Sequence, residues 1–292
     1  MKRFLLSIFA IGVMSLSATF TASAADKIRV VVSFSILKDL VEQIGRDAVV
    51  VETIIPNNAE PHSFEYTPDS IRKLLNSQLF VINGLGFEPW ADKLLRASNY
   101  QGQKLVASKG IKALPLRSHG GYDPHAWQDV ENVILYVKNI ADALAEVQPE
   151  KQDYFKSNEA AYSSQLKRLH ETITLTFQNI PESQRRAATN HEAFTYYGDA
   201  YGITFYGMKV SPVIAEDAKS LSSLIQKLKA DRVRAIFLEG VDASRLASQV
   251  SKETGIKIGG TLISDTLYDG KKTVTYLEMM RSNTKTIADA LR

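Results

Sequence analysis

Short apolar runs rich in β-branched residues alternate along the chain with stretches whose apolar residues recur at helical spacing. In the first half, the runs that predict strands are 28–34, 49–55, 79–82 and 104–106. In the second half they are 187–190, 203–208, 233–238 and 256–263, and Gly259 and Gly260 interrupt the last of them. Strands that alternate with helices in this way form parallel sheets with crossover helices. We therefore expect an α/β fold with two doubly wound lobes.

Residues typical of helix ends mark several of the predicted helices. Thr67 stands where a cap is expected, directly before Pro68 in the first turn of a helix. Gly202 follows the helical pattern of residues 193–201 and is expected to end it. The last helix is expected to cover residues 274–291. These end signals divide the chain into the same elements as the apolar periodicity does.

One helical pattern is much longer than the others. Residues 149–180 contain no glycine, and after Pro149 they contain no proline. At 1.5 Å per residue, such a helix spans on the order of 45 Å, about the length of a two-lobed protein. We interpret it as a rigid connector between an N-terminal lobe, residues 25–148, and a C-terminal lobe, residues 181–292.

The N-terminus has the pattern of an export signal. Lys2 and Arg3 precede an apolar stretch at 4–16, and Ala22-Ser23-Ala24 matches a cleavage site. Residues 1–24 are therefore predicted to be a signal peptide. A membrane anchor is the alternative, but the apolar stretch is shorter than the roughly 20 residues that span a bilayer.

Composition narrows the compartment and the classes of partner. The chain has no cysteine, so it can form no disulfide and carry no lipid on an N-terminal cysteine. A free periplasmic protein of a bacterium with two membranes fits this composition. The formal charge of the full chain is +3 and falls to +1 without Lys2 and Arg3, which gives no basic excess for nucleic acid.

Four potential metal ligands occur in separate stretches, each where a strand-like run has given way to a loop: His62, His125, His191 and Asp265. Three neutral imidazoles and one carboxylate make a complete set of ligands for a borderline divalent metal such as zinc. A set that closes around the ion leaves little room for a substrate, which favours carrying a metal over catalysis. Loops after parallel strands face the ligand crevice, and two of these residues fall in each half. A metal site in the cleft between the lobes is expected.

Other polar residues near these turns have more than one interpretation. Asp123 can cap the helix that follows it, or accept a hydrogen bond from the second ring nitrogen of a metal-binding histidine. Glu239 can support a ligand in the same way, or be a helix-start carboxylate. The remaining histidines, His119 in a loop and His170 in the long helix, are not expected to bind the metal directly.

At these residues the sequence resembles the cluster A-I substrate-binding proteins of zinc and manganese ABC importers, the zinc-uptake solute-binding family. The segments that carry the resemblance are 60–65, 123–127, 190–194, 201–202 and 264–265. The resemblance implies two α/β lobes joined by one long helix, with the metal buried between them. It implies His62, His125, His191 and Asp265 as ligands. It also implies delivery to a membrane permease driven by a separate ATPase.

The chain departs from the zinc branch of this family in two ways. Many zinc-branch members carry a long histidine-rich loop where this chain has only residues 117–122, and some carry a cysteine pair. Manganese-branch members often have glutamate at the position of His191. Three nitrogen ligands favour zinc, because manganese prefers more oxygen, whereas the short loop favours manganese. Zinc is expected ahead of manganese.

Two other functions are weighed against metal import. An exported zinc hydrolase would need an open ligand position and a general base, for which Glu192 or Glu239 can serve. The chain lacks a His-Glu-x-x-His motif, however, and Asp265 would fill the fourth position. An adhesin with a structural metal would need surface attachment, for which the chain has neither a lipid cysteine nor a wall anchor. A monomeric periplasmic solute-binding protein with no enzymatic activity is expected, with metal affinity that falls as pH drops through the imidazole range.

Overall fold

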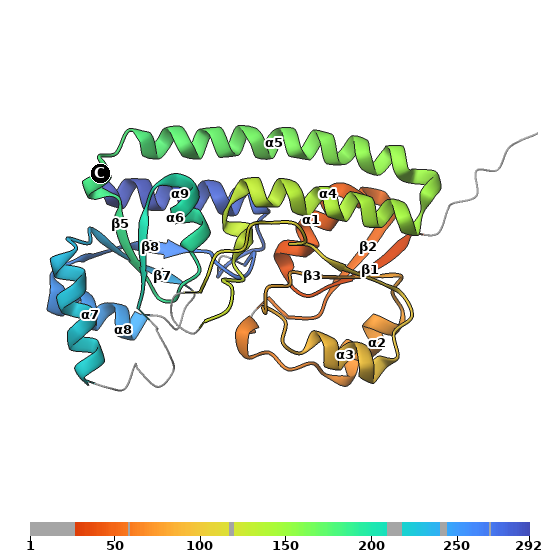
Figure 1. Cartoon of the computed structure of the whole chain (residues 1–292), viewed down its shortest axis with the longest axis horizontal. Helices are drawn as coiled ribbons and strands as arrows, with labels where there is room; N and C mark the ends of the chain where they lie inside the picture. The colour runs from red at the N-terminus through yellow and green to blue at the C-terminus, as the bar shows by residue number, and fades with distance from the viewer. Residues whose placement is uncertain (1–26, 58, 117–119, 209–217, 240–243, 269) are drawn as a thin grey trace, which may run out of the picture.

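The computed structural model describes residues 27–57, 59–116, 120–208, 218–239, 244–268 and 270–292. The predicted signal peptide and His119 lie outside these residues. Two four-stranded parallel sheets form within them, one from each half of the chain (Figure 1). The first contains β1 (Ile28–Val32), β2 (Val49–Thr53), β3 (Leu79–Ile82) and β4 (Gln103–Val106). The second contains β5 (Arg186–Thr189), β6 (Thr204–Gly207), β7 (Ala235–Glu239) and β8 (Lys257–Leu262).

Both sheets have the same strand order. It is β2-β1-β3-β4 in the first sheet and β6-β5-β7-β8 in the second, with every pairing parallel. The central strand β3 is buried throughout, as expected of a strand covered on both faces. The predicted α/β fold with parallel, doubly wound sheets is confirmed. Ligands of such sheets bind beyond the carboxyl ends of the strands, where the strand order reverses.

Helices cover both sheets and join them. In the N-terminal half they are α1 (Ser35–Gly45), α2 (Pro68–Leu75), α3 (Ala91–Ser98) and α4 (Val130–Val147). The others are α5 (Gln152–Gln178), α6 (Thr195–Tyr201), α7 (Ala218–Ala230), α8 (Ser244–Thr254) and α9 (Tyr276–Leu291). None of these helices combines the length and the apolar character needed to cross a bilayer. Sequence reasoning does not find α3, because its N-cap is Trp90, whose side chain gives no capping signal.

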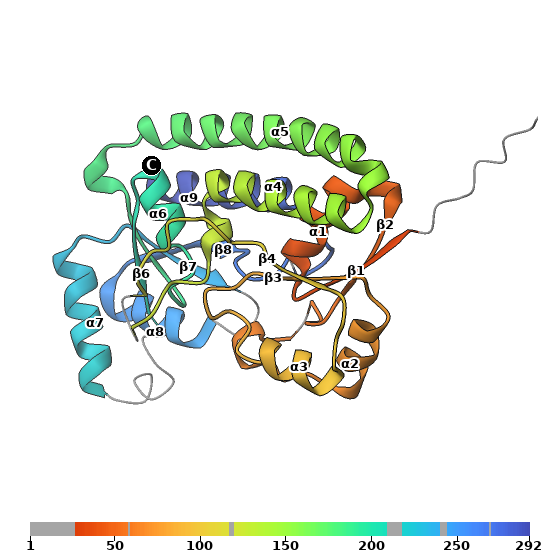
Figure 2. The same cartoon turned by 45° about the vertical axis from the view of Figure 1, so that its right-hand side comes forward.

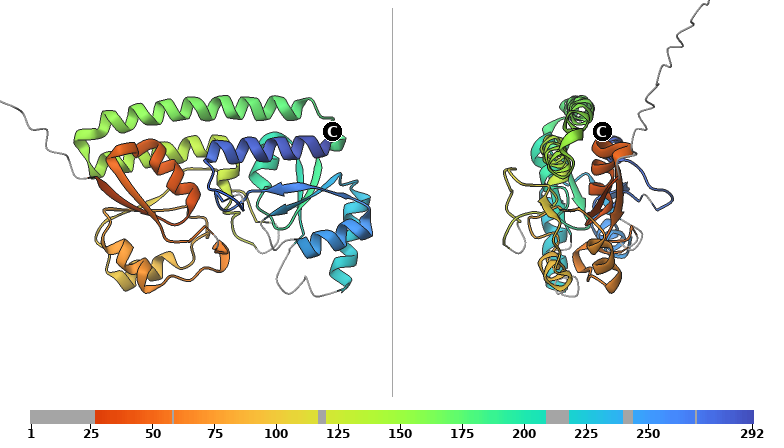
Figure 3. Two further views of the ribbon diagram at one scale, coloured as in Figure 1. Left: turned by 180° about the vertical axis from the view of Figure 1, so that it is seen from behind. Right: turned by 90° about the vertical axis from the view of Figure 1, so that its right-hand side faces the viewer.

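The long helix predicted over residues 149–180 is present. A 3₁₀ turn at Pro149–Lys151 leads into α5, which has 27 residues and ends at Gln178. It lies along both lobes (Figures 1 and 2), with α4 beneath it in the N-terminal half and α9 beneath it in the C-terminal half (Figure 3). It packs on α1 and α4 of the N-terminal half and on α6 and α9 of the C-terminal half.

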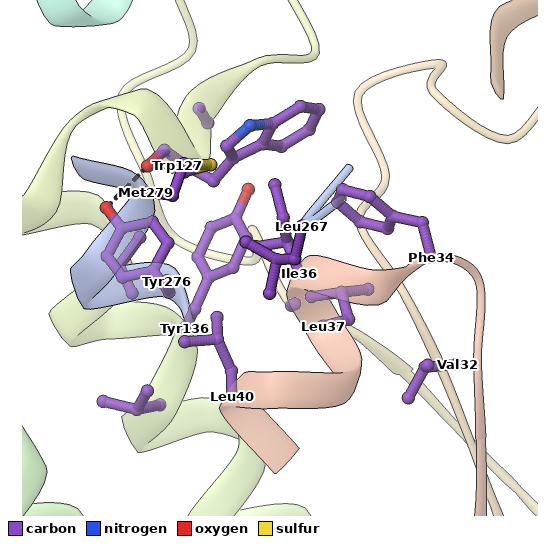
Figure 4. Packing of buried hydrophobic residues seen from close by; sticks show 14 of the residues in the cluster. Val32, Phe34, Ile36, Leu37, Leu40, Trp127, Tyr136, Leu267, Tyr276 and Met279 are labelled. Atoms are coloured by element: carbon purple, nitrogen blue, oxygen red, sulfur yellow. Dashed lines mark hydrogen bonds between the residues drawn. The ribbon is translucent and has the colours of Figure 1, made fainter. Parts of the chain in front are cut away.

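Most of the buried apolar side chains form one continuous cluster that crosses between the lobes. The cluster contains β1 to β3, α1, α4, the buried face of α5, and α9. Figure 4 shows part of it, where Tyr276 and Leu267 from the C-terminal half meet Trp127, Ile36 and Leu40. A smaller cluster under α7 and α8 is separate. The two lobes therefore have their own sheets but share a core.

Candidate metal centre

The structure brings His62, His125, His191 and Asp265 together. One ligand atom from each of them lies within 4.8 Å of the others. His191 and Asp265 lie just beyond the carboxyl ends of β5 and β8, as expected. His62 and His125 are further from their strands than expected. His62 lies in the 3₁₀ turn η2 (Pro61–Ser63). His125 is the N-cap of η3 (Ala126–Gln128), well after the end of β4 at Val106.

Proline explains both of these turns. Pro61 occupies the first position of η2, where its fixed φ suits a tight turn and its missing N–H leaves no donor unsatisfied. Pro124 directly precedes His125 and restricts Asp123 before it to extended backbone. The prolines therefore set the direction of the two histidines where no strand does so.

The four side chains point their donor atoms at one another. His191 Nε2 lies 3.1 Å from Asp265 Oδ2, and His62 Nε2 lies 3.6 Å from the same oxygen. His125 Nε2 lies 3.5 Å from Asp265 Oδ1 and 3.3 Å from His62 Nε2. A tetrahedral zinc ion with bonds of about 2.05 Å would have edges of roughly 3.3 Å between its ligands. The spacing of these atoms therefore suits a four-coordinate ion.

Carboxylates support two of the three imidazoles from behind. Asp123 Oδ1 lies 2.7 Å from His125 Nδ1 and also accepts a hydrogen bond from the His125 backbone N–H, at 2.9 Å. Glu239 Oε2 lies 3.0 Å from His191 Nδ1, and its Oε1 accepts from the His191 backbone N–H, at 3.2 Å. With Nδ1–H directed at a carboxylate, Nε2 of each ring faces the other three residues and is the atom that can bind a metal. Two interpretations were open for Asp123 and for Glu239. In the structure, each of these acids supports a histidine of the site.

His62 is held differently. Within the described part of the chain, Asp265 is the only carboxylate that contacts its ring, so no acid supports it from the other side, and its backbone N–H donates to Glu60. The ring instead lies edge-on to Phe87, at 5.3 Å between centroids. Its side chain is 36% exposed, against 25% for His191, 11% for Asp265 and 3% for His125. Solvent therefore reaches the group of four from the His62 side.

The charges of Asp265 and His191 stabilise each other. Burial alone would raise the pKa of the Asp265 carboxyl, but the charges of His191 and His125 outweigh it and hold that pKa well below its usual value. Burial would likewise lower the pKa of His191, but the negative charges of Glu239 and Asp265 raise it well above its usual value. The metal-free site thus holds an ionised aspartate against a protonated His191. That proton must leave when a cation takes its place.

A second group with metal-binding atoms contains Asp129, Glu131 and His170, which also come within 4.8 Å of one another. His170 packs on Tyr201, with its Nδ1 3.4 Å from the phenol oxygen. Asp129 is already the N-cap of α4 and accepts a hydrogen bond from the Glu131 N–H. Cations are disfavoured at the positive end of a helix. This group is therefore the weaker candidate.

One supporting residue escapes the sequence reasoning. Glu88 is buried in the turn after β3, where it accepts hydrogen bonds from the Ser33 hydroxyl, at 2.6 Å, and from the backbone N–H groups of Asn83 and Gly84. Burial raises the pKa of the Glu88 carboxyl to about 7, against the lowering effect of these bonds. The signal in the sequence is an acid in the otherwise apolar stretch Phe87-Glu88-Pro89-Trp90.

The Asn83 side chain links the turn after β3 to the residues around His125. Its Nδ2 donates to the carbonyl of Pro124, the residue before His125, at 2.9 Å. Its Oδ1 accepts from the Tyr136 hydroxyl at 2.6 Å. The turn after β3 therefore supplies no candidate ligand but supports two of them, His125 through Asn83 and His62 through Phe87.

Comparisons with known proteins show the family of the chain and its fold. The chain matches the family model described as zinc-uptake complex component A, periplasmic, over residues 30–290. It is 31% identical over 284 residues to the manganese ABC transporter substrate-binding lipoprotein PsaA of Streptococcus pneumoniae, covering 94% of this chain and 92% of that protein. It is also 31% identical over 285 residues to the iron-binding protein YfeA of Yersinia pestis, covering 95% and 91%. The solved structure of the periplasmic zinc-binding protein TroA from Treponema pallidum matches with a TM-score of 0.83 at 26% identity, over 91% of this chain and 99% of that one.

Proposed function

Because the chain belongs to the zinc-uptake component A family, the cluster A-I substrate-binding proteins of metal ABC importers, we propose that it captures one divalent transition-metal ion and delivers it to a membrane permease. Members of this family are solute-binding proteins and not enzymes. The hydrolase alternative is therefore set aside. The relatives are named for manganese, iron and zinc, so the family alone leaves the metal open.

The ligands in this proposal are His62, His125, His191 and Asp265. The observation that carries it is the convergence of their donor atoms, with neighbouring pairs 3.1 to 3.6 Å apart. Four protein atoms fill a tetrahedral shell, which leaves no position for a reacting water. A filled shell is what a carrier needs and a catalytic metal site avoids.

Zinc is the proposed cargo, with manganese as the second candidate. Three imidazole nitrogens and one carboxylate suit zinc, whereas manganese prefers more oxygen donors and more ligands. The two supporting carboxylates, Asp123 and Glu239, strengthen the nitrogen donors further.

We also propose where and with what the protein works. Residues 1–24 would be removed on export, which leaves a monomeric chain in the periplasm. The relatives named above include a lipoprotein and a periplasmic protein, and this chain has no cysteine to carry a lipid. The partner is the permease of an ABC importer, powered by its own ATPase.

Native mass spectrometry of the metal-free protein, with zinc and manganese in competition, tests the ligand set and the cargo together. We expect one ion per chain and retention of zinc. Asp265→Ala and His191→Ala should both bind zinc at least about 10-fold more weakly, since each leaves a coordination position open. His170→Ala, which changes a histidine of the long helix, should bind like the wild type.

Two results would contradict the proposal. If the wild type takes up no ion, or if the two site variants bind as tightly as His170→Ala, the four residues are not the ligands. Growth in metal-poor medium tests delivery separately: cells that lack the protein should be rescued by the wild type and not by Asp265→Ala.

A further inference from the structure

The backbone beside Asp265 is held by the N-terminal half of the molecule, although Asp265 follows the last strand of the C-terminal sheet. The carbonyl oxygen of Ser264 accepts two hydrogen bonds, from Trp127 Nε1 at 2.9 Å and from Gln128 Nε2 at 3.2 Å. Both donor side chains are fully buried, at 0% exposure. A buried carbonyl with two donors has both lone pairs engaged, so the direction of its C=O bond is fixed.

Fixing this carbonyl fixes Asp265. The peptide bond between Ser264 and Asp265 is planar, so the Ser264 oxygen and the Cα of Asp265 share one plane. Side chains from other elements hold the adjoining backbone as well. Asn283 on α9 bonds both the N–H and the C=O of Ile263, and Ser35 accepts from the N–H of Leu267, at 2.8 Å. The segment that presents Asp265 is therefore fixed by side chains, beyond the end of the sheet.

The same short turn reaches a second member of the site. Trp127 and Gln128 lie two and three positions after His125, and the Trp127 ring lies edge-on to the His125 ring, at 5.3 Å between centroids. The Trp127 carbonyl accepts from the Tyr276 hydroxyl at 2.8 Å, which ties the turn to α9 (Figure 4). His125 Nε2 lies 3.5 Å from Asp265 Oδ1. The turn thus fixes His125 and Asp265 relative to each other.

We propose that Trp127 and Gln128 are positioning residues that set Asp265 at binding distance from His125. This inference rests on the proposed function, because it assigns a role within that metal site. Neither side chain is a ligand; both act through the Ser264 carbonyl. With the peptide plane held in place, the carboxylate needs little ordering when the ion arrives. Loss of such support around a metal site typically lowers affinity by about 10- to 100-fold.

Gln128→Leu tests the positioning role while keeping all four proposed ligands. The variant keeps the Trp127 donor on Ser264, so no buried carbonyl is left unpaired. Gln148→Leu is the matched control, because Gln148 is also buried but lies at the other end of α4.

We expect Gln128→Leu to weaken zinc binding by about 10-fold or more. It should also alter the visible absorption spectrum of bound Co²⁺, which responds to ligand geometry. The control should change neither, and the melting temperatures of the two metal-free variants should be similar.

A double variant shows whether Gln128 acts through Asp265. In an Asp265→Ala background, Gln128→Leu should cause no further loss of affinity, because there is no carboxylate left to position. If the two losses multiply, or if Gln128→Leu binds like Gln148→Leu with an unchanged Co²⁺ spectrum, the positioning role is wrong. If Asp265→Ala itself binds like the wild type, the ligand set fails, and this role fails with it.

Discussion

At the scale of single residues, the metal preference of the site depends on its three nitrogen donors and on the two acids, Asp123 and Glu239, that hydrogen-bond to them. At His191 the donor set can be changed with one compensating substitution, because Glu239 is its only close carboxylate partner besides Asp265 among the described residues. A metal preference that follows from donor chemistry should therefore change with this one side chain.

Replacing His191 by glutamate should shift the preference from zinc towards manganese. The change exchanges a nitrogen for an oxygen donor, and Glu239→Gln should accompany it, because two adjacent buried carboxylates would repel each other. The ratio of zinc to manganese affinity should fall by at least about 10-fold in the double variant. Titration calorimetry measures both affinities, and Glu239→Gln alone is the control. An unchanged ratio would mean that donor type does not set the preference.

Glu88 should make the metal-free protein less stable as pH rises. Its pKa is about 7 in the folded chain against 4.5 for an ordinary glutamate, so the folded state binds more protons between these values. The stabilisation is fully present below pH 4.5 and is lost as pH rises to 7, at up to about 1.4 kcal/mol per pH unit. Urea unfolding at several pH values measures it, with Glu88→Gln as the reference. Parallel curves for the two proteins would show that Glu88 titrates normally.

Sequence reasoning reaches the four converging residues because each follows a recognisable run and turn. It does not decide the roles of Asp123 and Glu239, because a carboxylate at a turn can cap a helix as well as support a histidine. Only the distance between the carboxylate and the imidazole distinguishes these two roles. It does not find Gln128 or Glu88. The partners of these side chains, Ser264 and Ser33, are 136 and 55 positions away, and no local pattern encodes such a contact.

At the scale of elements, β8 has the least regular pairing, and its irregularity precedes Asp265. Ile258 pairs with Ile236 but Gly260 pairs with Phe237, so Gly259 is an extra residue that forms a bulge. An added Cβ at Gly259 would lie 2.7 Å from side-chain atoms of both Phe237 and Ala290. The bulge and the close packing of α9 on β8 therefore require glycine at this position.

Gly259→Ala should destabilise the protein by about 1 to 3 kcal/mol, because the methyl group must displace a buried phenylalanine ring or α9. Urea unfolding of the metal-free protein measures the change. Thr261→Ala, at an exposed position of the same strand, should change the stability by no more than about 0.5 kcal/mol. Equal effects of the two substitutions would mean that the packing around Gly259 has no special role.

A helix or strand can be predicted from the sequence where characteristic residues mark its ends. Thr67 caps α2 and Gly202 follows the end of α6 with φ at +71°, both as expected. The interruption expected at Gly259 and Gly260 corresponds to the bulge. Helix α3 is missed, because it starts without a capping side chain, and the 3₁₀ turns that carry His62 and precede α4 are too short to have a period.

At the scale of the whole molecule, the shared core sets how far the lobes can move. The cluster that crosses between them includes α4, α5 and α9, so wide opening would expose apolar surface as well as bend α5. Sequence patterns predict two lobes and a long helix but not a common core. Periodicity shows which face of a helix is buried and not what it is buried against.

Small-angle scattering should show little difference between the metal-free and the zinc-loaded protein. The two curves are expected to superimpose within error, because the shared core keeps the lobes together in both states. A protein with an added Gly-Gly pair in the middle of α5 gives the comparison for a weakened connector. A clear compaction of the wild type on binding zinc would show that the lobes hinge widely despite their common core.

The order of the site residues along the chain has a consequence for protein synthesis. The three histidines of the site leave the ribosome well before Asp265, and α9, whose Asn283 holds Ile263, emerges after Asp265. The set of four ligands is therefore complete only once Asp265 has been synthesised. Any translation product that stops before residue 265 lacks the anionic donor and cannot compete with longer copies for a scarce ion.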